Sequence, residues 1–329
     1  MFNAFSTLHI VAASVIGIKF LIKLIDIVVV REEILEPEDL RKEASIALGN
    51  NAPVRHEHGV MRPLNLEEIM TRDVVRVTPE NTLYEAAQLM GEKRIGGLLV
   101  LKYDTPVGII TERDLLNVVS CGVKLEKDWI GGGTSIRDEK VEKVMSFPVA
   151  KICLASPLKE AARIMIEKRI RRLAVCDLGK VVGIVTAADM IRSLPEAPED
   201  MEVWFQVDYF MSKKVITVDA EMLVENVAEV MAEKRVGSVI VTSQGKPKGI
   251  FTERDLLTKF LANDKSLIVE VGNACSSPLI TASIGICIHE AAEIMTTNRI
   301  KRLPITRDKK LVGILSARDL VEAYARAAT

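Results

Sequence analysis

The sequence predicts an α/β (α+β) fold made of four similar β-α-β-β-α units. Segments that begin at Met70, Met145, Met211 and Cys275 each reach a glycine 38 positions later, without insertion or deletion. Within each copy, strand-like and helix-like spacings of apolar residues follow one another in the same order. Because a unit of this size is marginally stable alone, the copies are expected to bury one another. The residues that return in all four copies are Ala87/Ala162/Ala228/Ala292, Met90/Met165/Met231/Met295, Arg94/Arg169/Arg235/Arg299 and Asp114/Asp189/Asp255/Asp319.

The elements of one unit can be assigned in order from the first copy. A valine-rich stretch at 74–77 indicates a short strand, and the apolar spacing from Leu83 to Met90 indicates a helix with one buried face. GLLVL (97–101) and PVGIIT (106–111) predict two strands separated by a turn. ERDLLNVV then predicts a second helix. We interpret the repeated methionine as a core residue rather than a sulfur ligand.

The connections between copies predict the domain organisation. SLPEAPEDMEVW, between the second and third copies, is rich in proline and acidic residues and is the most plausible boundary between two pairs of units. We expect an amino-terminal hydrophobic segment and linker at 1–65, units at 66–120, 141–195, 207–262 and 271–325, and linkers at 121–140 and 196–206.

Composition excludes several functional classes. The chain of 329 residues is 48% hydrophobic and 27% charged, which is typical of a globular protein with ample core. A net charge of -1 and 4% aromatic residues argue against RNA binding. Five cysteines without a CxxC pair indicate free thiols in a reducing cytoplasm. No nucleophile, base and orienting group recur together, so we expect no enzyme, no cofactor and no metal site.

The amino-terminal stretch 10–30 is the one candidate for membrane contact. It is about long enough to cross a bilayer, but Lys19, Lys23 and Asp26 interrupt it, each at a cost of roughly 2.5–3.5 kcal/mol at the membrane centre. Three interpretations stay open: a membrane anchor, a helix packed on the globular body, and a segment absent from the mature protein. We interpret His56 and His58 as linker residues.

A polar motif recurs where the last strand of each unit meets the following helix. Its form is Gly, two apolar residues, Thr or Ser, two variable residues and Asp. The hydroxyl and the carboxylate could cap the helix, although a capping box more often uses Glu or Gln. Alternatively, the Asp could accept both hydroxyls of a ribose while the hydroxyl and the helix N-terminus bind its phosphate. The pairs are Thr111 with Asp114, Thr186 with Asp189, Thr252 with Asp255, and Ser316 with Asp319.

A second feature alternates between copies. The even copies carry the basic pairs Arg171-Arg172 and Lys301-Arg302, and the odd copies have Gly96-Gly97 and Gly237-Ser238 at the same place. TERDLL also occurs only in the odd copies. The alternation favours unlike partners that share a cleft, so the four copies need not form four equal sites.

With these motifs the sequence resembles tandem cystathionine-beta-synthase (CBS) domains over about residues 66–325. Four copies without a catalytic domain are similar to stand-alone prokaryotic CBS proteins and to the gamma subunit of AMP-activated protein kinase. The resemblance implies two Bateman modules, each a pseudo-twofold pair of units, in a disc-like arrangement. It also implies adenine nucleotides (AMP, ADP or ATP) in the clefts and a role in energy sensing.

The resemblance further implies roles for individual residues. The four motif Asp residues would bind ribose and the four hydroxyl residues would bind phosphate or ribose. No histidine occupies the basic pairs, in contrast to the gamma subunit, so the preferred number of phosphates stays open. The phosphate-binding residues would be Arg171, Arg172, Lys301 and Arg302, and the adenine pocket would include Val75, Val77, Ile216 and Val218.

The sequence therefore predicts a non-catalytic regulatory protein that passes nucleotide occupancy to an unidentified partner. S-adenosylmethionine or another adenosyl compound is the alternative ligand, and a membrane-tethered regulator is compatible with either. A homodimer also stays open.

Overall fold

A computed structural model of the chain describes residues 65–103, 105–126, 136–193 and 206–327. These residues belong to one compact unit. The hydrophobic stretch 10–30 and the two linker histidines lie outside the described residues. Within the described ranges, no helix is both long and apolar enough to cross a membrane.

Each repeat has the predicted β-α-β-β-α order. In the first repeat these elements are β1 (Arg76–Val77), α5 (Leu83–Glu92), β2 (Gly97–Lys102), β3 (Thr105–Thr111) and α6 (Glu112–Glu126). The central strand β2 pairs in parallel with β1 and antiparallel with β3. The same three-stranded sheet recurs in the other repeats, so the fold predicted from apolar spacing is confirmed.

The other three repeats differ mainly in the lengths of their last helices. The second contains β4 (Lys151–Cys153), α7 (Leu158–Glu167), β5 (Arg172–Asp177), β6 (Lys180–Thr186) and α8 (Ala187–Arg192). The third contains β7 (Thr217–Asp219), α9 (Val224–Glu233), β8 (Ser238–Ser243), β9 (Lys246–Thr252) and α10 (Glu253–Lys259). The fourth contains β10 (Ala282–Ser283), α12 (Ile288–Thr297), β11 (Arg302–Arg307), β12 (Lys310–Ser316) and α13 (Ala317–Ala327).

The first helix of each repeat buries one face, and α5 and α12 also have a side-chain cap at their start. In α5, Thr82 and Glu85 form a capping box, which satisfies backbone N–H groups at the helix start. Leu83, Ala87 and Met90 are fully buried on one face. The counterparts of Met90 are also buried, which confirms the repeated methionine as a core residue.

A short segment at the start of each repeat, ahead of its first strand, packs on the neighbouring repeat. Helix α4 (Leu66–Ile69) begins the first repeat but joins the core of the second, and Thr71 pairs with Ile184. The 3-10 helix η1 (Val141–Lys143) in turn packs on the first repeat. The segments η3 (Val207–Tyr209) and α11 (Val271–Ala274) are exchanged in the same way between the third and fourth repeats. These exchanges define a first module, repeats 1 and 2, and a second module, repeats 3 and 4.

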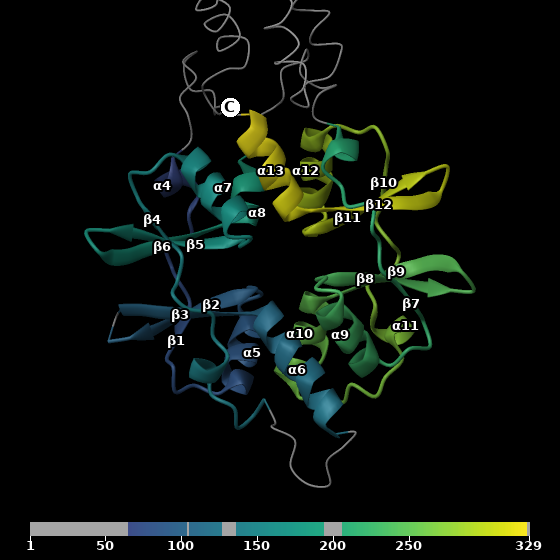
Figure 1. Cartoon of the computed structure of the whole chain (residues 1–329), viewed down its shortest axis with the longest axis horizontal. Coiled ribbons are helices and arrows are strands. Elements are labelled where there is room, and N and C mark those ends of the chain that lie inside the picture. The colour runs from purple at the N-terminus through teal and green to yellow at the C-terminus, as the bar shows by residue number, and fades with distance from the viewer. Residues whose placement is uncertain (1–64, 104, 127–135, 194–205, 328–329) are drawn as a thin grey trace, which may run out of the picture. The chain divides into compact units, whose positions relative to one another are not determined.

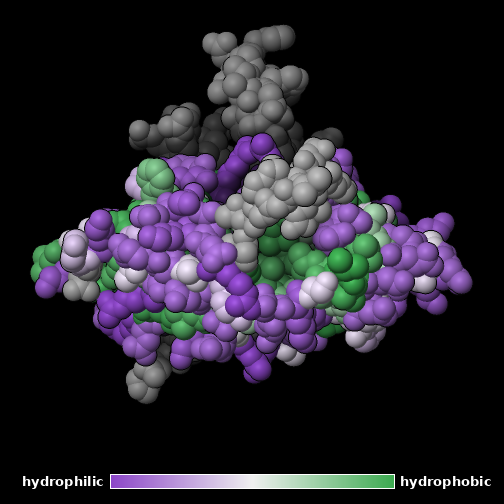
Figure 2. Space-filling model, turned by 90° about the horizontal axis from the view of Figure 1, so that it is seen from below, coloured by the Kyte–Doolittle hydropathy of each residue, from purple (hydrophilic) through white to green (hydrophobic). Residues whose placement is uncertain are grey.

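The two large hydrophobic cores cross the boundary between modules. One core joins helices of repeats 1 and 3, and the other joins helices of repeats 2 and 4. In Figure 1 these helices lie at the bottom and the top, and the sheets lie between them. Leu99, Val149 and Ala174 form a smaller core between the sheets of the first module. Seen from below, polar residues cover most of the described surface, with a smaller apolar area among them (Figure 2).

Candidate functional site

The polar motif caps the last helix in all four repeats. In the first, Thr111 donates from its backbone N and its Oγ1 to Asp114 Oδ2, over 2.8 and 2.6 Å. The other motifs repeat both hydrogen bonds at 2.6–2.9 Å. The capping interpretation is therefore confirmed, and one carboxylate oxygen of each Asp is already used. A ribose would have to bind the other oxygen, Oδ1.

In two of the motifs that second oxygen is also occupied. Asp189 Oδ1 accepts a hydrogen bond from Arg192, three residues further along its own helix. Asp255 Oδ1 forms an ion pair with Lys259 over 2.6 Å and accepts a hydrogen bond from Ser276 Oγ over 2.9 Å. Both carboxylates are thus neutralised by residues of the protein.

In the other two motifs the second oxygen is less engaged. Asp114 Oδ1 accepts one long hydrogen bond, of 3.4 Å, from Ser146. Asp319 Oδ1 has no hydrogen bond or ion pair within the described residues. Burial raises the pKa of both carboxyls, and the capping hydrogen bonds oppose this rise. These two carboxylates can still accept hydrogen bonds from a ligand.

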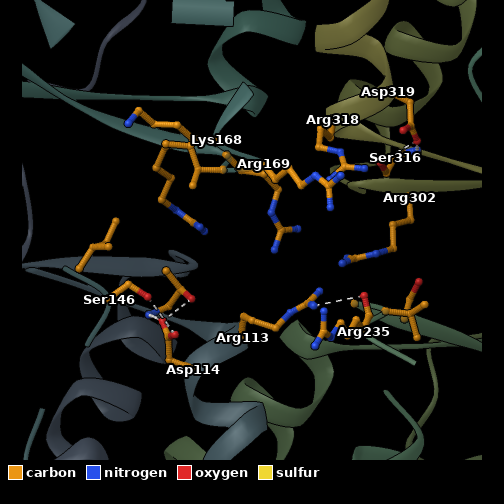
Figure 3. A pocket seen from close by; sticks show the side chains of 18 of the residues that line it. Arg113, Asp114, Ser146, Lys168, Arg169, Arg235, Arg302, Ser316, Arg318 and Asp319 are labelled. Atoms are coloured by element: carbon orange, nitrogen blue, oxygen red, sulfur yellow. Dashed lines mark hydrogen bonds between the residues drawn. The ribbon is translucent and has the colours of Figure 1, made fainter. Parts of the chain in front are cut away.

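Asp114 and Asp319 line one cavity of about 690 Å³ that is bounded by all four repeats. They lie at opposite ends of the view in Figure 3, with arginines between them. The apolar part of the lining includes Ile109, Ile240 and Ile314. The cationic part consists of nine side chains: Arg113, Lys168, Arg169, Arg171, Arg172, Lys214, Arg235, Arg302 and Arg318.

A second cavity of about 300 Å³ lies beside Asp189. Thr186 and Lys301 line it together with Gly96 and Gly97. Arg171 and Arg172 line both cavities. Thr252 and Asp255, by contrast, line neither of these two cavities. The structure therefore brings most of the predicted site residues together, but around two cavities of different size rather than four equal clefts.

The small residues of the odd repeats lie against the basic residues of the even repeats. A Cβ atom on Gly96 would overlap Arg172 Nη2, and a Cβ atom on Gly237 would overlap Arg302 Nη2. The second member of each basic pair thus stays within its own module. Arg171, the first member of its pair, instead crosses to the other module and pairs with Glu253 over 3.3 Å.

Two buried glutamates of the odd repeats, Glu112 and Glu253, form ion pairs that the sequence did not predict. Glu253 binds Arg113 and Arg302, the latter over 3.2 Å, and Glu112 binds Arg254. Glu112 and Glu253 are the Glu of TERD, and Arg113 and Arg254 are its Arg. The sequence held one signal for these residues, because TERD occurs only in the odd copies. A helix cap requires the Thr and the Asp of this motif but not the Glu and Arg between them.

The electrostatic state of this cluster follows from burial and excess positive charge. Burial would raise the pKa of Glu253, but Arg302, Arg171 and Arg113 lower it to about 2. Burial lowers the pKa of Arg172 to about 10 and that of Lys301 to about 8. Partly buried cations that lack enough counter-charge favour the binding of an anion.

The expected adenine pocket needs a correction. Ile216 lines the larger cavity and Val75 lines the smaller one. Val77 and Val218 instead belong to the core between repeats 1 and 3, with 7% and 5% of their surface exposed. Both lie within the short first strands, where alternation turns them toward the helices.

Comparison with known proteins agrees with this architecture. A curated relative from Thermofilum pendens, a 33.4 kDa protein of a ribosomal RNA operon, is 32% identical over 202 residues, which is 58% of this chain and 63% of the relative. MJ1404 from Methanocaldococcus jannaschii is 26% identical over 280 residues, 79% of this chain and 62% of the relative. The matches thus span less than two thirds of the length of these two relatives.

The solved structure of protein MJ1225 from Methanocaldococcus jannaschii has the same fold, with a TM-score of 0.66. The sequences are 21% identical, and the match covers 79% of this chain and 100% of that protein. A family model described as the CBS domain matches residues 66–121, 141–196, 207–262 and 271–326. Because these four segments make up more than half of the sequence, the chain belongs to the CBS domain family.

Proposed function

We propose that the chain is a regulatory protein that binds adenine nucleotides at two of its four motifs, those of Asp114 and Asp319. One observation carries the proposal: two carboxylates that can still accept hydrogen bonds lie in the same cavity as nine Lys or Arg side chains. The paired state of Asp189 and Asp255 argues against a ribose at those two positions.

The chemistry of the cavity matches the three parts of a nucleotide. A carboxylate oxygen accepts hydrogen bonds from the two ribose hydroxyls, as in dinucleotide-binding folds. Arginine guanidinium groups bind phosphate oxygens in bidentate geometry and remain charged. Isoleucine side chains such as Ile109 and Ile314 offer an apolar contact for a base.

The charge of the cavity favours nucleotides over S-adenosylmethionine. The adenosyl sulfonium carries a positive charge at the position where a nucleotide carries phosphate. Nine cations against two carboxylates would repel that charge. AMP, ADP and ATP are therefore the proposed ligands, and the role is energy sensing without catalysis. The occupied state would be read by a protein partner whose identity the cavity does not specify.

A pair of matched variants tests the ribose assignment. Asp114→Ala and Asp255→Ala both remove the cap in the same TERDLL sequence, but only Asp114 lines the cavity. Asp114→Ala should weaken ATP binding at one of the two sites by at least about tenfold, because hydrogen bonds to a charged group are lost. Asp255→Ala should leave it within about threefold of the wild type. Equilibrium dialysis measures both, and equal effects of the two variants would show that the Asp serves only the cap.

The same assay separates the two ligand classes. Arg302→Ala should weaken ATP binding and leave adenosine binding unchanged, because Arg302 is one of the cavity cations proposed to bind phosphate. S-adenosylmethionine that binds the wild type more tightly than ATP would overturn the choice of nucleotide. The absence of binding by AMP, ADP and ATP would overturn the proposed function as a whole.

A further inference from the structure

Glu253 is the one described carboxylate that contacts arginines from three other repeats. Its Oε1 accepts a hydrogen bond from Arg113 of the first repeat. Its Oε2 accepts hydrogen bonds from Arg171 of the second repeat, over 3.3 Å, and Arg302 of the fourth, over 3.2 Å. The Glu253 side chain is 1% exposed. A single buried carboxylate of the third repeat therefore connects the whole assembly of repeats.

All three arginines also line the larger cavity, whereas Glu253 itself does not. Glu253 lies behind the cavity wall and holds part of the positive charge that a ligand phosphate would use. A carboxylate and a phosphate compete directly for guanidinium groups, because both accept charge-assisted hydrogen bonds in the same geometry. Glu253 thus reduces the positive charge that the cavity offers to a ligand.

Glu112 provides an internal comparison. It occupies the same position of TERD in the first repeat and is also buried. Its ion pair is with Arg254, which lines the smaller cavity and not the larger one. The two glutamates therefore share sequence context and burial but differ in which cations they engage.

We propose that Glu253 is an internal anion that occupies Arg113, Arg171 and Arg302 in the empty protein and that an entering phosphate group must displace. The ligand class rests on the proposed function, but the competition for the three arginines does not. Glu253 thereby sets how much the affinity for a ligand increases with its number of phosphates. Each added negative charge interacts more favourably with arginines that Glu253 has released. The three arginines lower the pKa of Glu253, so the carboxylate is charged at neutral pH and can compete with phosphate there.

The contacts of Glu253 also link phosphate binding to the arrangement of the modules. Glu253 belongs to the second module, and two of its arginines, Arg113 and Arg171, belong to the first. Displacement of the carboxylate would remove these contacts between modules. Occupancy could then favour a second arrangement, because a ligand shifts such an equilibrium through its different affinity for the two states.

The test compares Glu253→Gln with Glu112→Gln in the full chain. Binding of inorganic pyrophosphate, ATP and adenosine is measured by titration calorimetry. Glu253→Gln should bind pyrophosphate and ATP at least about tenfold more tightly than the wild type, with adenosine unchanged. Glu112→Gln should strengthen pyrophosphate and ATP binding less than Glu253→Gln does, because Glu112 accepts a hydrogen bond from Arg254 and from none of the three arginines that Glu253 engages. Unchanged or weaker pyrophosphate binding by Glu253→Gln would overturn the proposal.

A second variant and a second measurement guard against a folding defect. Glu253→Asp keeps the charge and should remain within about threefold of the wild type; an affinity gain equal to that of Glu253→Gln would contradict competition by charge. In the wild-type chain, pyrophosphate should increase hydrogen–deuterium exchange at the start of α10, where Glu253 loses its partners. Decreased or unchanged exchange there would also contradict the proposal.

These outcomes separate the two proposals. Pyrophosphate that binds more tightly to Glu253→Gln, in a chain that binds no nucleotide, would support the internal anion and refute the nucleotide ligand. Nucleotides that bind the wild type and Glu253→Gln equally would support the proposed function and refute the role of Glu253.

Discussion

At the scale of single residues, the arginine that follows the first helix of each repeat has an unfavourable backbone conformation. Arg94, Arg169, Arg235 and Arg299 all have φ of 53–54°, in the left-handed region. A non-glycine residue there costs roughly 1–2 kcal/mol relative to its ordinary conformation. Arg94, Arg169 and Arg235 line one of the cavities, whereas Arg299 lines neither. The conformation places a cation beside a cavity in three of four repeats.

We predict that Arg169→Gly stabilises the fold and weakens ligand binding. Glycine relieves the backbone strain and should raise the free energy of unfolding by up to about 1 kcal/mol. Loss of one cavity cation should weaken ATP binding roughly three- to tenfold. Thermal denaturation and titration calorimetry measure the two effects.

Arg299→Gly is the matched control for this prediction. It has the same backbone conformation but lines neither cavity, so it should gain stability without a change in affinity. Equal losses of affinity in the two variants would show that the arginine acts through the backbone and not through its charge.

The role of each motif Asp could be predicted only in part from the sequence. Cap geometry depends on neighbours along the chain, and the spacing of Thr and Asp predicted it in all four copies. The basic partners Arg192 and Lys259 lie three and four residues after their Asp and were also readable, because these positions share a helix face. Ser146 and Ser276 come from the neighbouring repeat, so their contacts required the structure.

Among the elements, the order β-α-β-β-α could be predicted from apolar spacing, because the spacing in each helix and strand is a local property of the chain. The exchange of short segments between repeats could not be predicted from it. Leu66 lies in a four-residue helix before the first repeat and is fully buried in the core of the second. The apolar pattern shows that Leu66 is buried but not which repeat buries it.

We predict that Leu66→Ala destabilises the protein by about 2–5 kcal/mol, since a fully buried leucine is replaced by a cavity. Urea denaturation measures the change. Glu67→Ala, in the same helix but exposed and paired only with Arg72 at the surface, should cost less than about 1 kcal/mol. If Leu66→Ala lowered the free energy of unfolding no more than Glu67→Ala, α4 would not pack on the second repeat as described.

At the scale of the whole molecule, each large core joins repeats from different modules. The helices of repeats 1 and 3 need one another to bury their apolar faces, and the same holds for repeats 2 and 4. Charge is also brought together from different repeats, because nine cations surround one cavity although the net charge of the chain is -1. Neither property could be obtained from composition, since both depend on which surfaces meet.

Four similar repeats are thus proposed to form two nucleotide sites in one shared cavity. Titration of the full chain with ATP, followed by calorimetry, counts these sites directly. The wild type and the double variant Asp189→Ala/Asp255→Ala should each bind two ATP molecules per chain, and Asp114→Ala/Asp319→Ala should lose tight binding at both sites. Four molecules per wild-type chain, or wild-type affinity in Asp114→Ala/Asp319→Ala, would overturn the assignment of two sites.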